Sequence, residues 1–389
     1  MTALIRSVRY KMRIARGLAP VPGPKGRFLL GILPELMKNS PRMYNYQEEL
    51  MKQYGGCMHF PWHLFSNGML FIGSSEDVQH VLSTNFRNYV KSSHFQASFG
   101  RLLANSLVTL NHVHTEDSGA MWRLQHKLAV KVFSTRNFTL LGEQLFHKYA
   151  LQMSELIEAQ GGRCNMHDIS SQYTLQVIFD ITRSVPLKGV DGALGLSFIH
   201  SLNTMAEAVS RRTSSTSGGR YERIMSDIVN KILARKLSEL LGEIEKRFDI
   251  ISLFIQKAPE VSQVDVDRSE NPRGIADSVV SAASLLNIEM LRSVLFAFTS
   301  AGWDTTSALS TYTFYALALY PEIKILKELE NKLVEKASTV DTLPLLSYDD
   351  IKTLRYLDAV VSEVLRVHPT IVFDMKVAAE DDHLPDGHR

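Results

Sequence analysis

Apolar residues recur at helical spacing over most of the chain. The longest patterns with spacings of three and four residues cover 119–180, 222–257, 285–319 and 348–367. A short apolar run at 69–73 predicts a buried strand, followed by a helix that starts near Ser74 or Ser75. Because strands are few and short, the sequence predicts a mainly α fold with a small β part.

The first 16 residues are basic and contain no acid. Arg6, Arg9, Arg13 and Arg16 recur at helical spacing, as on one face of a helix. The sequence therefore predicts a basic amphipathic segment over 1–16, which is either a membrane-surface or targeting segment or a solvated tail. The proline-rich stretch that follows, 17–27, predicts a stiff hinge that cannot continue the helix.

Composition and charge narrow the class of protein. The 389 residues are 45% hydrophobic, which suits a sizeable core and excludes a disordered chain. The formal net charge is +2, and this near balance argues against nucleic-acid binding. The two cysteines exclude a disulfide scaffold and a multi-cysteine zinc site. No apolar run approaches the roughly 18 residues that a membrane-spanning helix needs.

The common nucleotide-binding and hydrolase motifs are missing from the sequence. It contains no G-x-G-x-x-G, no G-x-x-x-x-G-K-[ST], no H-E-x-x-H and no G-x-S-x-G. Kinase, zinc-enzyme and hydrolase functions therefore have no support from short motifs.

Weak helix formers lie at the centre of the longest predicted helix. Residues 301–306 read Ala-Gly-Trp-Asp-Thr-Thr, and Gly302 alone costs about 1 kcal/mol relative to alanine inside a helix. Aspartate and threonine side chains also compete for backbone hydrogen bonds. Local inconsistency of this kind is expected at functional sites.

Two interpretations fit this segment. In the first, Gly302 lets a flat ligand approach the backbone, and Thr305 bonds the carbonyl of Ala301 and opens a local bulge. Asp304 and Thr305 then provide an acid and a hydroxyl for a proton relay. In the second, the small residues permit a close helix–helix crossing. The residues alone favour neither.

Glu363 and Arg366 form a second candidate pair. At a spacing of three they face one another on a predicted helix. The apolar stripe of that helix lies elsewhere, with Arg366 nearly opposite, so periodicity favours a solvated surface pair.

These segments together resemble the cytochrome P-450 superfamily of haem-thiolate monooxygenases. Residues 301–306 are similar to its oxygen-activating A-G-x-[DE]-T-T helix, and Glu363 with Arg366 is similar to its E-x-x-R helix, followed here by His368 and Pro369. Residues 373–376 and 380–387 resemble the branch that hydroxylates fatty acids near the chain end. The resemblance covers nearly all of the chain.

The resemblance implies a role for each residue of the long-helix motif. Thr305 matches the threonine that hydrogen-bonds the oxygen being activated, and Asp304 matches the neighbouring acid in proton delivery. Ala301 and Gly302 match residues that line the distal face of the haem. Trp303 fills a variable position, where its bulk is tolerable only if it points away from the haem.

Further matches concern the haem periphery and the core. Trp122 matches a tryptophan that contacts a haem propionate, and His126 stands where an arginine is usual, so it keeps a donor without a fixed charge. Lys376 stands where a propionate-binding arginine is common in other branches. Glu363 and Arg366 match a buried pair that helps fix the haem-binding core.

The iron ligand of the family has no counterpart in the chain. That ligand is a cysteine in a loop near the C-terminus, and neither Cys57 nor Cys164 has the required context, so each is interpreted as a packing residue. The metal-ligating residue is thus expected to be missing, with 28–389 forming a haem-monooxygenase domain that is incomplete at its C-terminus. Because the thiolate favours O–O cleavage, this chain alone is expected to be inactive.

The resemblance implies an activity, cofactors and partners for the full-length protein. It would use O₂, a haem and NADPH electrons supplied by a reductase to hydroxylate a lipophilic substrate, implied to be a fatty acid. The expected location is the cytosolic face of the endoplasmic reticulum membrane, with no nucleic-acid partner. The alternative is a non-catalytic truncated product, at most a membrane-surface lipid-binding protein.

Overall fold

The computed structural model divides the chain into two compact units, 1–92 with 374–389, and 93–373. It describes residues 2–27, 29–61, 68–103, 105–112, 116–135, 139, 145–183, 250, 252, 254, 288–322, 325–337, 346–385 and 387. The description that follows takes each unit by itself.

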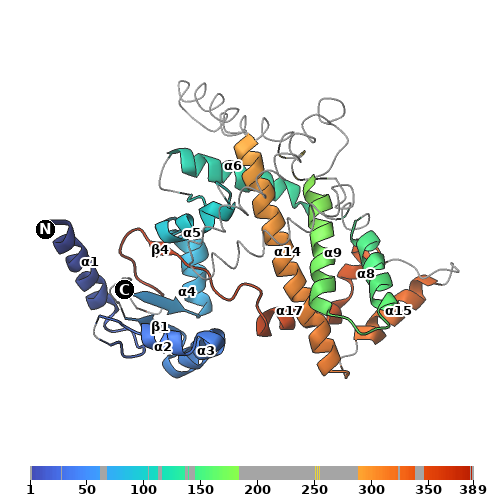
Figure 1. Ribbon diagram of the computed structural model, residues 1–389, viewed down its shortest axis with the longest axis horizontal. Coiled ribbons are helices and arrows are strands. Elements are labelled where there is room, and N and C mark those ends of the chain that lie inside the picture. The colour runs from blue at the N-terminus through green and yellow to red at the C-terminus, as the bar shows by residue number, and fades with distance from the viewer. Residues whose placement is uncertain are drawn as a thin grey trace. The chain divides into compact units, whose positions relative to one another are not determined.

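The first unit combines short helices with two small antiparallel sheets (Figure 1). Its α-helices are α1 (Thr2–Leu18), α2 (Leu33–Lys38), α3 (Met43–Tyr54) and α4 (Ser75–Gln79). Two short 3-10 helices, η1 (Ser40–Arg42) and η3 (Phe86–Asn88), and a short π-helix, η2 (His80–Thr84), are also present. Strand β1 (Cys57–Phe60) pairs with β2 (Met69–Ile72), and β3 (Tyr89–Val90) pairs with β4 (Val377–Ala378). The C-terminal residues thus return to the N-terminal unit through β4.

Local signals in the sequence explain the elements around β2. The apolar run becomes a strand in register with β1, from Cys57↔Ile72 to Phe60↔Met69. Ser74 then caps α4 by accepting a hydrogen bond from the backbone N–H of Asp77 at 3.1 Å. The sheet packs on two small clusters, and their buried members are Val21, Cys57, Val81, Leu384, Ile32, Leu50, Met58 and Phe60.

The second unit is helical where it is described. Its elements are α5 (Ser93–Leu103), α6 (Glu116–Val132), α8 (His147–Ala159), α9 (Met166–Arg183), α14 (Ile288–Leu319), α15 (Ile325–Ala337), α16 (Tyr348–Lys352) and α17 (Arg355–Val367). The long helices α9 and α14 lie side by side along much of their length (Figure 1). Their facing side chains form most of the main core, including Leu175, Ile178, Phe179, Val294, Leu295 and Trp303.

The mainly α prediction is confirmed, with some boundaries corrected. The long helix expected at 285–319 is α14, and the strand expected at 69–73 is β2. The helix expected at 348–367 is two helices: α16 begins after its N-cap Ser347 and ends before Thr353, and α17 begins at Arg355. Helix α1 runs through Leu18, two residues into the expected hinge. The helix expected at 222–257 lies almost wholly outside the described residues.

No helix among the described residues is both long enough and apolar enough to cross a membrane.

Candidate functional site

The weak helix formers of α14 lie in an uninterrupted helix. Thr305 Oγ1 donates a hydrogen bond to the carbonyl oxygen of Ala301 at 2.5 Å, as its position four residues later predicts. The helix nevertheless continues from Ile288 to Leu319, so the expected local bulge is wrong. A threonine hydroxyl can share this carbonyl without displacing the backbone N–H, because a carbonyl oxygen has two lone pairs.

The two sides of this helical turn differ sharply in burial. Ala301 and Asp304 are exposed, and Thr305 is partly exposed. Trp303 is buried in the core, as its bulk requires. Its carbonyl accepts a hydrogen bond from Thr174 Oγ1 of α9 at 3.1 Å, while its indole Nε1 makes no hydrogen bond. The segment therefore presents Ala301, Asp304 and Thr305 away from the core.

Gly302 lies between these two sides and packs on α9. A Cβ at this position would lie 2.6 Å from Ile178 Cδ1, closer than carbon atoms can approach. The predicted use of Gly302, approach of a flat ligand to the backbone, is thus corrected: the missing side chain makes room for Ile178. The contact of Gly302 with Ile178 therefore supports the second interpretation, a close helix crossing. The exposed neighbours of Gly302 are still compatible with the first interpretation, a ligand that lies against this helix.

Trp122 and His126 stack on one another along α6. Their ring centroids are 4.9 Å apart with an interplanar angle of 17°, as expected for aromatic residues four apart on a helix. His112 packs on Trp122 as well, at 5.6 Å and 54°. His126 is exposed and Trp122 only partly so, and the stacking holds both rings in a fixed orientation at the surface of the unit.

Glu363 and Arg366 form a bidentate pair on the surface of α17. Arg366 Nε and Nη2 donate to the two carboxylate oxygens of Glu363 at 2.7 and 2.6 Å. The side chains are 59% and 70% exposed, so the buried pair implied by the family resemblance is corrected to the solvated pair that periodicity favoured. The hydrogen bonds from Arg366 lower the pKa of Glu363 below its ordinary value.

Both cysteines lie among packing neighbours. Cys57 is buried in β1 against Val21 and Val81, and Cys164 lies with its Sγ 3.6 Å from the Sδ of Met166. Both fit the packing role that their sequence context suggested. Among the described residues, no group of histidine, cysteine and acidic side chains could hold a metal ion.

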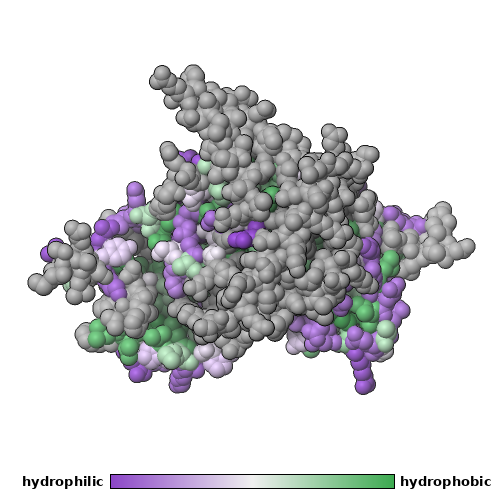
Figure 2. Space-filling model, turned by 45° about the horizontal axis from the view of Figure 1, so that its top comes forward, coloured by the Kyte–Doolittle hydropathy of each residue, from purple (hydrophilic) through white to green (hydrophobic). Residues whose placement is uncertain are grey.

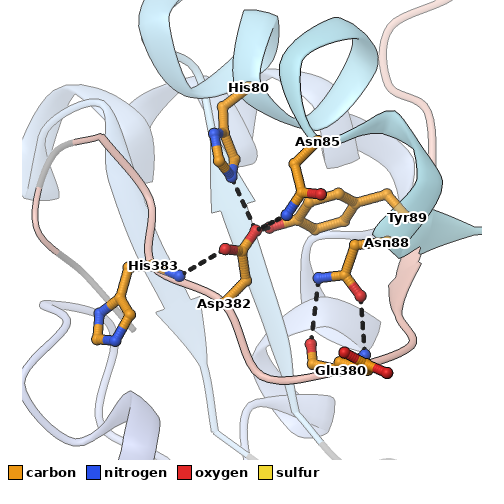
Figure 3. Close-up of polar contacts among 7 residues, drawn as sticks. All are labelled: His80, Asn85, Asn88, Tyr89, Glu380, Asp382 and His383. Carbon is orange, nitrogen blue, oxygen red and sulfur yellow. Dashed lines mark hydrogen bonds and ion pairs between the residues drawn. The ribbon is translucent and has the colours of Figure 1, made fainter.

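A polar cluster in the first unit escaped sequence analysis. Asp382 Oδ2 accepts hydrogen bonds from Asn85 Nδ2 at 2.9 Å and Tyr89 Oη at 2.8 Å, and lies 2.8 Å from His80 Nε2 (Figure 3). Burial by itself would raise the pKa of Asp382, but these hydrogen bonds and one from the His383 backbone outweigh it. The pKa of Asp382 is therefore held well below its ordinary value.

Asn88 adds a second attachment point beside Asp382. Its side chain accepts from the Glu380 backbone N–H at 2.8 Å and donates to the Glu380 carbonyl at 3.2 Å (Figure 3). The partners are about 290 residues apart in sequence, so no local spacing could have revealed them. Together these contacts fix the segment that carries β4 on β3.

Comparison with known proteins places the chain in one family. A family profile described as Cytochrome P450 matches residues 21–388. Cytochrome P450 94B1 of Arabidopsis thaliana is 26% identical, with 99% of this chain and 72% of that protein covered. The Alkane hydroxylase MAH1 of the same plant is 24% identical, with 92% of this chain and 70% of that protein covered. The chain therefore belongs to the cytochrome P450 family, whose members are haem monooxygenases that receive NADPH electrons through a reductase.

Proposed function

We propose that this P450 monooxygenase hydroxylates a fatty acid. The observation that carries the site is the exposed Ala301, Asp304 and Thr305 side of α14, opposite the buried Trp303. Support for the substrate class comes from residues 373–376 and 380–387, which resemble fatty-acid hydroxylases, and from similarity to a relative named as an alkane hydroxylase.

The exposed side of α14 has the chemistry of the face that a haem would lie against. Ala301 offers a small apolar surface, and Thr305 with Asp304 offers a hydroxyl and a carboxyl beside it. The stacked rings of Trp122 and His126 supply N–H groups that can donate to a propionate. When bound, the haem supplies the oxidation of the substrate by O₂. Cys57 and Cys164 are given packing roles in this proposal.

Thr305 would orient a hydrogen-bonding partner beside a bound haem. Its hydroxyl proton is directed to the Ala301 carbonyl, so the oxygen lone pairs face outward as acceptors. An acceptor at this place can hold a water in line for proton transfer. The short hydrogen bond fixes the hydroxyl rotamer, which keeps this acceptor preorganised.

Asp304 carries protons toward Thr305. Asp304 is exposed, whereas the preceding residue, Trp303, is buried in the core. Asp304 therefore faces solvent beside the side of the helix that is proposed to receive the haem. A carboxyl group in this position can exchange protons with water and pass them along a short chain of hydrogen bonds. Glu363 and Arg366 are proposed to act outside this relay, as a pair that stabilises α17.

We further propose that the first unit rests on the cytosolic face of the endoplasmic reticulum membrane. The segment 1–16 is basic, and Tyr10 and Met12 on α1 are about half exposed. Other exposed apolar residues of this unit are Leu29, Leu30, Met37, Tyr44 and Met69. Hydrophobic side chains lie among hydrophilic ones on the described surface (Figure 2). Basic and apolar groups together favour an interface of anionic lipid.

One experiment separates this proposal from the non-catalytic alternative. Residues 1–389 are expressed with haem, and the protein is reduced and exposed to CO. It is then supplied with reductase, NADPH and dodecanoate. A thiolate-type CO band with formation of hydroxydodecanoate supports the enzyme. A bound haem without that band, or dodecanoate binding without product, supports the lipid-binding alternative.

A further inference from the structure

Two leucines lie exposed on a tight turn between the proline-rich hinge and α2. The backbones of Arg27 and Gly31 exchange two hydrogen bonds of 2.8 Å, each N–H donating to the other residue's carbonyl, and these bonds close the turn. Leu29 and Leu30 lie within it and are 45% and 46% exposed. Single exposed leucines are common on protein surfaces, so exposure by itself does not identify a binding surface.

The backbone conformation of Leu29 is also unfavourable. Its φ is 61°, and among the residues that the structure describes it is the one residue other than glycine with a positive φ. The Cβ of a leucine makes this left-handed region costly, whereas glycine or asparagine adopts it readily. Asparagine would also suit an exposed turn better than leucine does. The turn therefore carries a residue that is unfavourable in conformation and in solvation, which is typical of functional segments.

The chain on both sides of the turn is fixed to the first unit. Before the turn, Val21 is 2% exposed, and the hinge is bonded to β1. The His59 backbone N–H donates to the Pro22 carbonyl at 2.9 Å, and His59 Nδ1 donates to the Val21 carbonyl at 2.6 Å. After the turn, Ile32 is 1% exposed in the second small core cluster. These attachments hold the two leucines at the surface of the unit.

The surroundings of the turn are positively charged. The first 34 residues contain seven basic residues and no acidic one. Lys25 and Arg27, next to the two leucines, are exposed. Part of this charge is balanced, because Arg27 donates to Glu35 at 2.9 Å and Arg13 of α1 pairs with Asp381. The positive charge that remains beside exposed apolar side chains complements a bilayer with anionic headgroups.

We propose that the turn at 27–31 inserts Leu29 and Leu30 into the interface of an anionic membrane. This inference rests on the membrane placement proposed above for the first unit, and it names the residues that enter the lipid. Because the fold already holds the turn outward, it is preorganised for insertion. Insertion removes the two leucine side chains from water, while Lys25 and Arg27 contact the headgroups beside them.

The test measures cosedimentation of the full 389-residue chain with vesicles. One set of vesicles contains phosphatidylcholine and phosphatidylserine, and the other contains phosphatidylcholine alone. Leu29→Asn and Leu30→Asn each remove an inserted side chain, and Lys25→Gln removes a headgroup contact. The control is Leu82→Asn, because Leu82 of η2 is 48% exposed in the same unit. Urea unfolding reports the stability of each variant, and size-exclusion chromatography reports its oligomeric state.

The proposal expects Leu29→Asn and Leu30→Asn each to weaken binding to the anionic vesicles about tenfold. Leu29→Asn should at the same time raise the urea midpoint of unfolding, because asparagine adopts the left-handed conformation more readily than leucine. Lys25→Gln should lower the preference for vesicles with phosphatidylserine about fivefold. Leu82→Asn should leave the affinity unchanged.

The results that overturn the proposal are distinct from those that reject the membrane placement. If the parent chain binds anionic vesicles and both leucine variants of the turn bind equally well, the membrane placement stands and the turn does not insert. If the parent chain binds neither kind of vesicle, both fail. A lower urea midpoint for Leu29→Asn would show that the leucine is there for the fold and would overturn the proposal. Self-association that Leu29→Asn abolishes, without vesicle binding, would instead assign the turn to a second copy of the chain.

Discussion

Thr305 hydrogen-bonds the carbonyl of Ala301 at 2.5 Å, one turn earlier on the exposed side of an unbroken helix. The same turn buries Trp303 against α9. A helix that divides its polar and aromatic residues in this way can hold a ligand on one side while its other side anchors the core.

In a version of the protein that carries the family's cysteine loop, replacing Thr305 with alanine should uncouple oxygen consumption from product formation. The variant loses the preorganised acceptor, so reducing equivalents are diverted, and we expect about a tenfold or greater fall in product per NADPH consumed. The control is Thr313→Ala, because Thr313 makes the same type of bond, to Leu309 at 2.8 Å, farther along α14. Equal coupling in the two variants would contradict the role of Thr305.

Replacing Gly302 with alanine should destabilise the helix pair. The new Cβ would meet Ile178 Cδ1 at 2.6 Å, and β-branched Ile178 has little rotamer freedom to move away. We expect a loss of about 1–3 kcal/mol from overpacking, reduced by up to about 1 kcal/mol through better helix propensity.

Urea unfolding of Gly302→Ala, measured with isoleucine and with valine at position 178, tests that contact. The Gly302→Ala substitution should cost less when Ile178 is valine, since the clashing Cδ1 is then removed. A Gly302→Ala variant that is more stable than the parent chain would show that α9 does not pack closely at this residue.

Asp382 should make the first unit sensitive to acid. Its pKa is lowered on folding, so the carboxylate stabilises the folded state at neutral pH, and this contribution is lost as the pH falls from the unfolded pKa toward the folded one. Asp382→Asn should lower the unfolding free energy at pH 7 by about 1–3 kcal/mol and flatten its dependence on pH between about 5 and 2. A variant with the parent slope would indicate that another group sets the acid sensitivity.

Glu363 and Arg366 should couple weakly. Both side chains are well exposed, so solvent and salt screen their interaction. A double-mutant cycle with Glu363→Gln and Arg366→Met should give a small coupling that vanishes at 1 M salt. A large coupling that resists salt would place the pair in a buried setting, as the family resemblance implied.

The sequence predicts those contacts and helix ends that are set by residues close to one another along the chain. The hydrogen bond from Thr305 follows from its distance of four residues to Ala301, and the start of α4 follows from Ser74. The sequence does not predict the break before α17, because the apolar spacing continues across Thr353. Periodicity alone gives no sign of a helix end when the stripe resumes in phase.

Contacts between distant segments could not be predicted. Nothing near Gly302 names Ile178 as its neighbour, and nothing near His80 points to Asp382. Likewise, Glu328 of α15 accepts from the backbone N–H groups of Tyr356 and Leu357 and so begins α17 from another helix. Such partners are set by the packing of whole elements, which residue spacing does not encode.

The central claim, that the Ala301 and Thr305 side of α14 receives the haem, is tested most directly by titrating the full chain with haem and following its absorbance. Ala301→Phe places a ring on that side, and Ala318→Phe places one at another exposed alanine of the same helix. We expect Ala301→Phe to weaken haem binding about tenfold or more and Ala318→Phe to leave it unchanged. Haem binding that is equal in the parent chain and in Ala301→Phe would contradict the account.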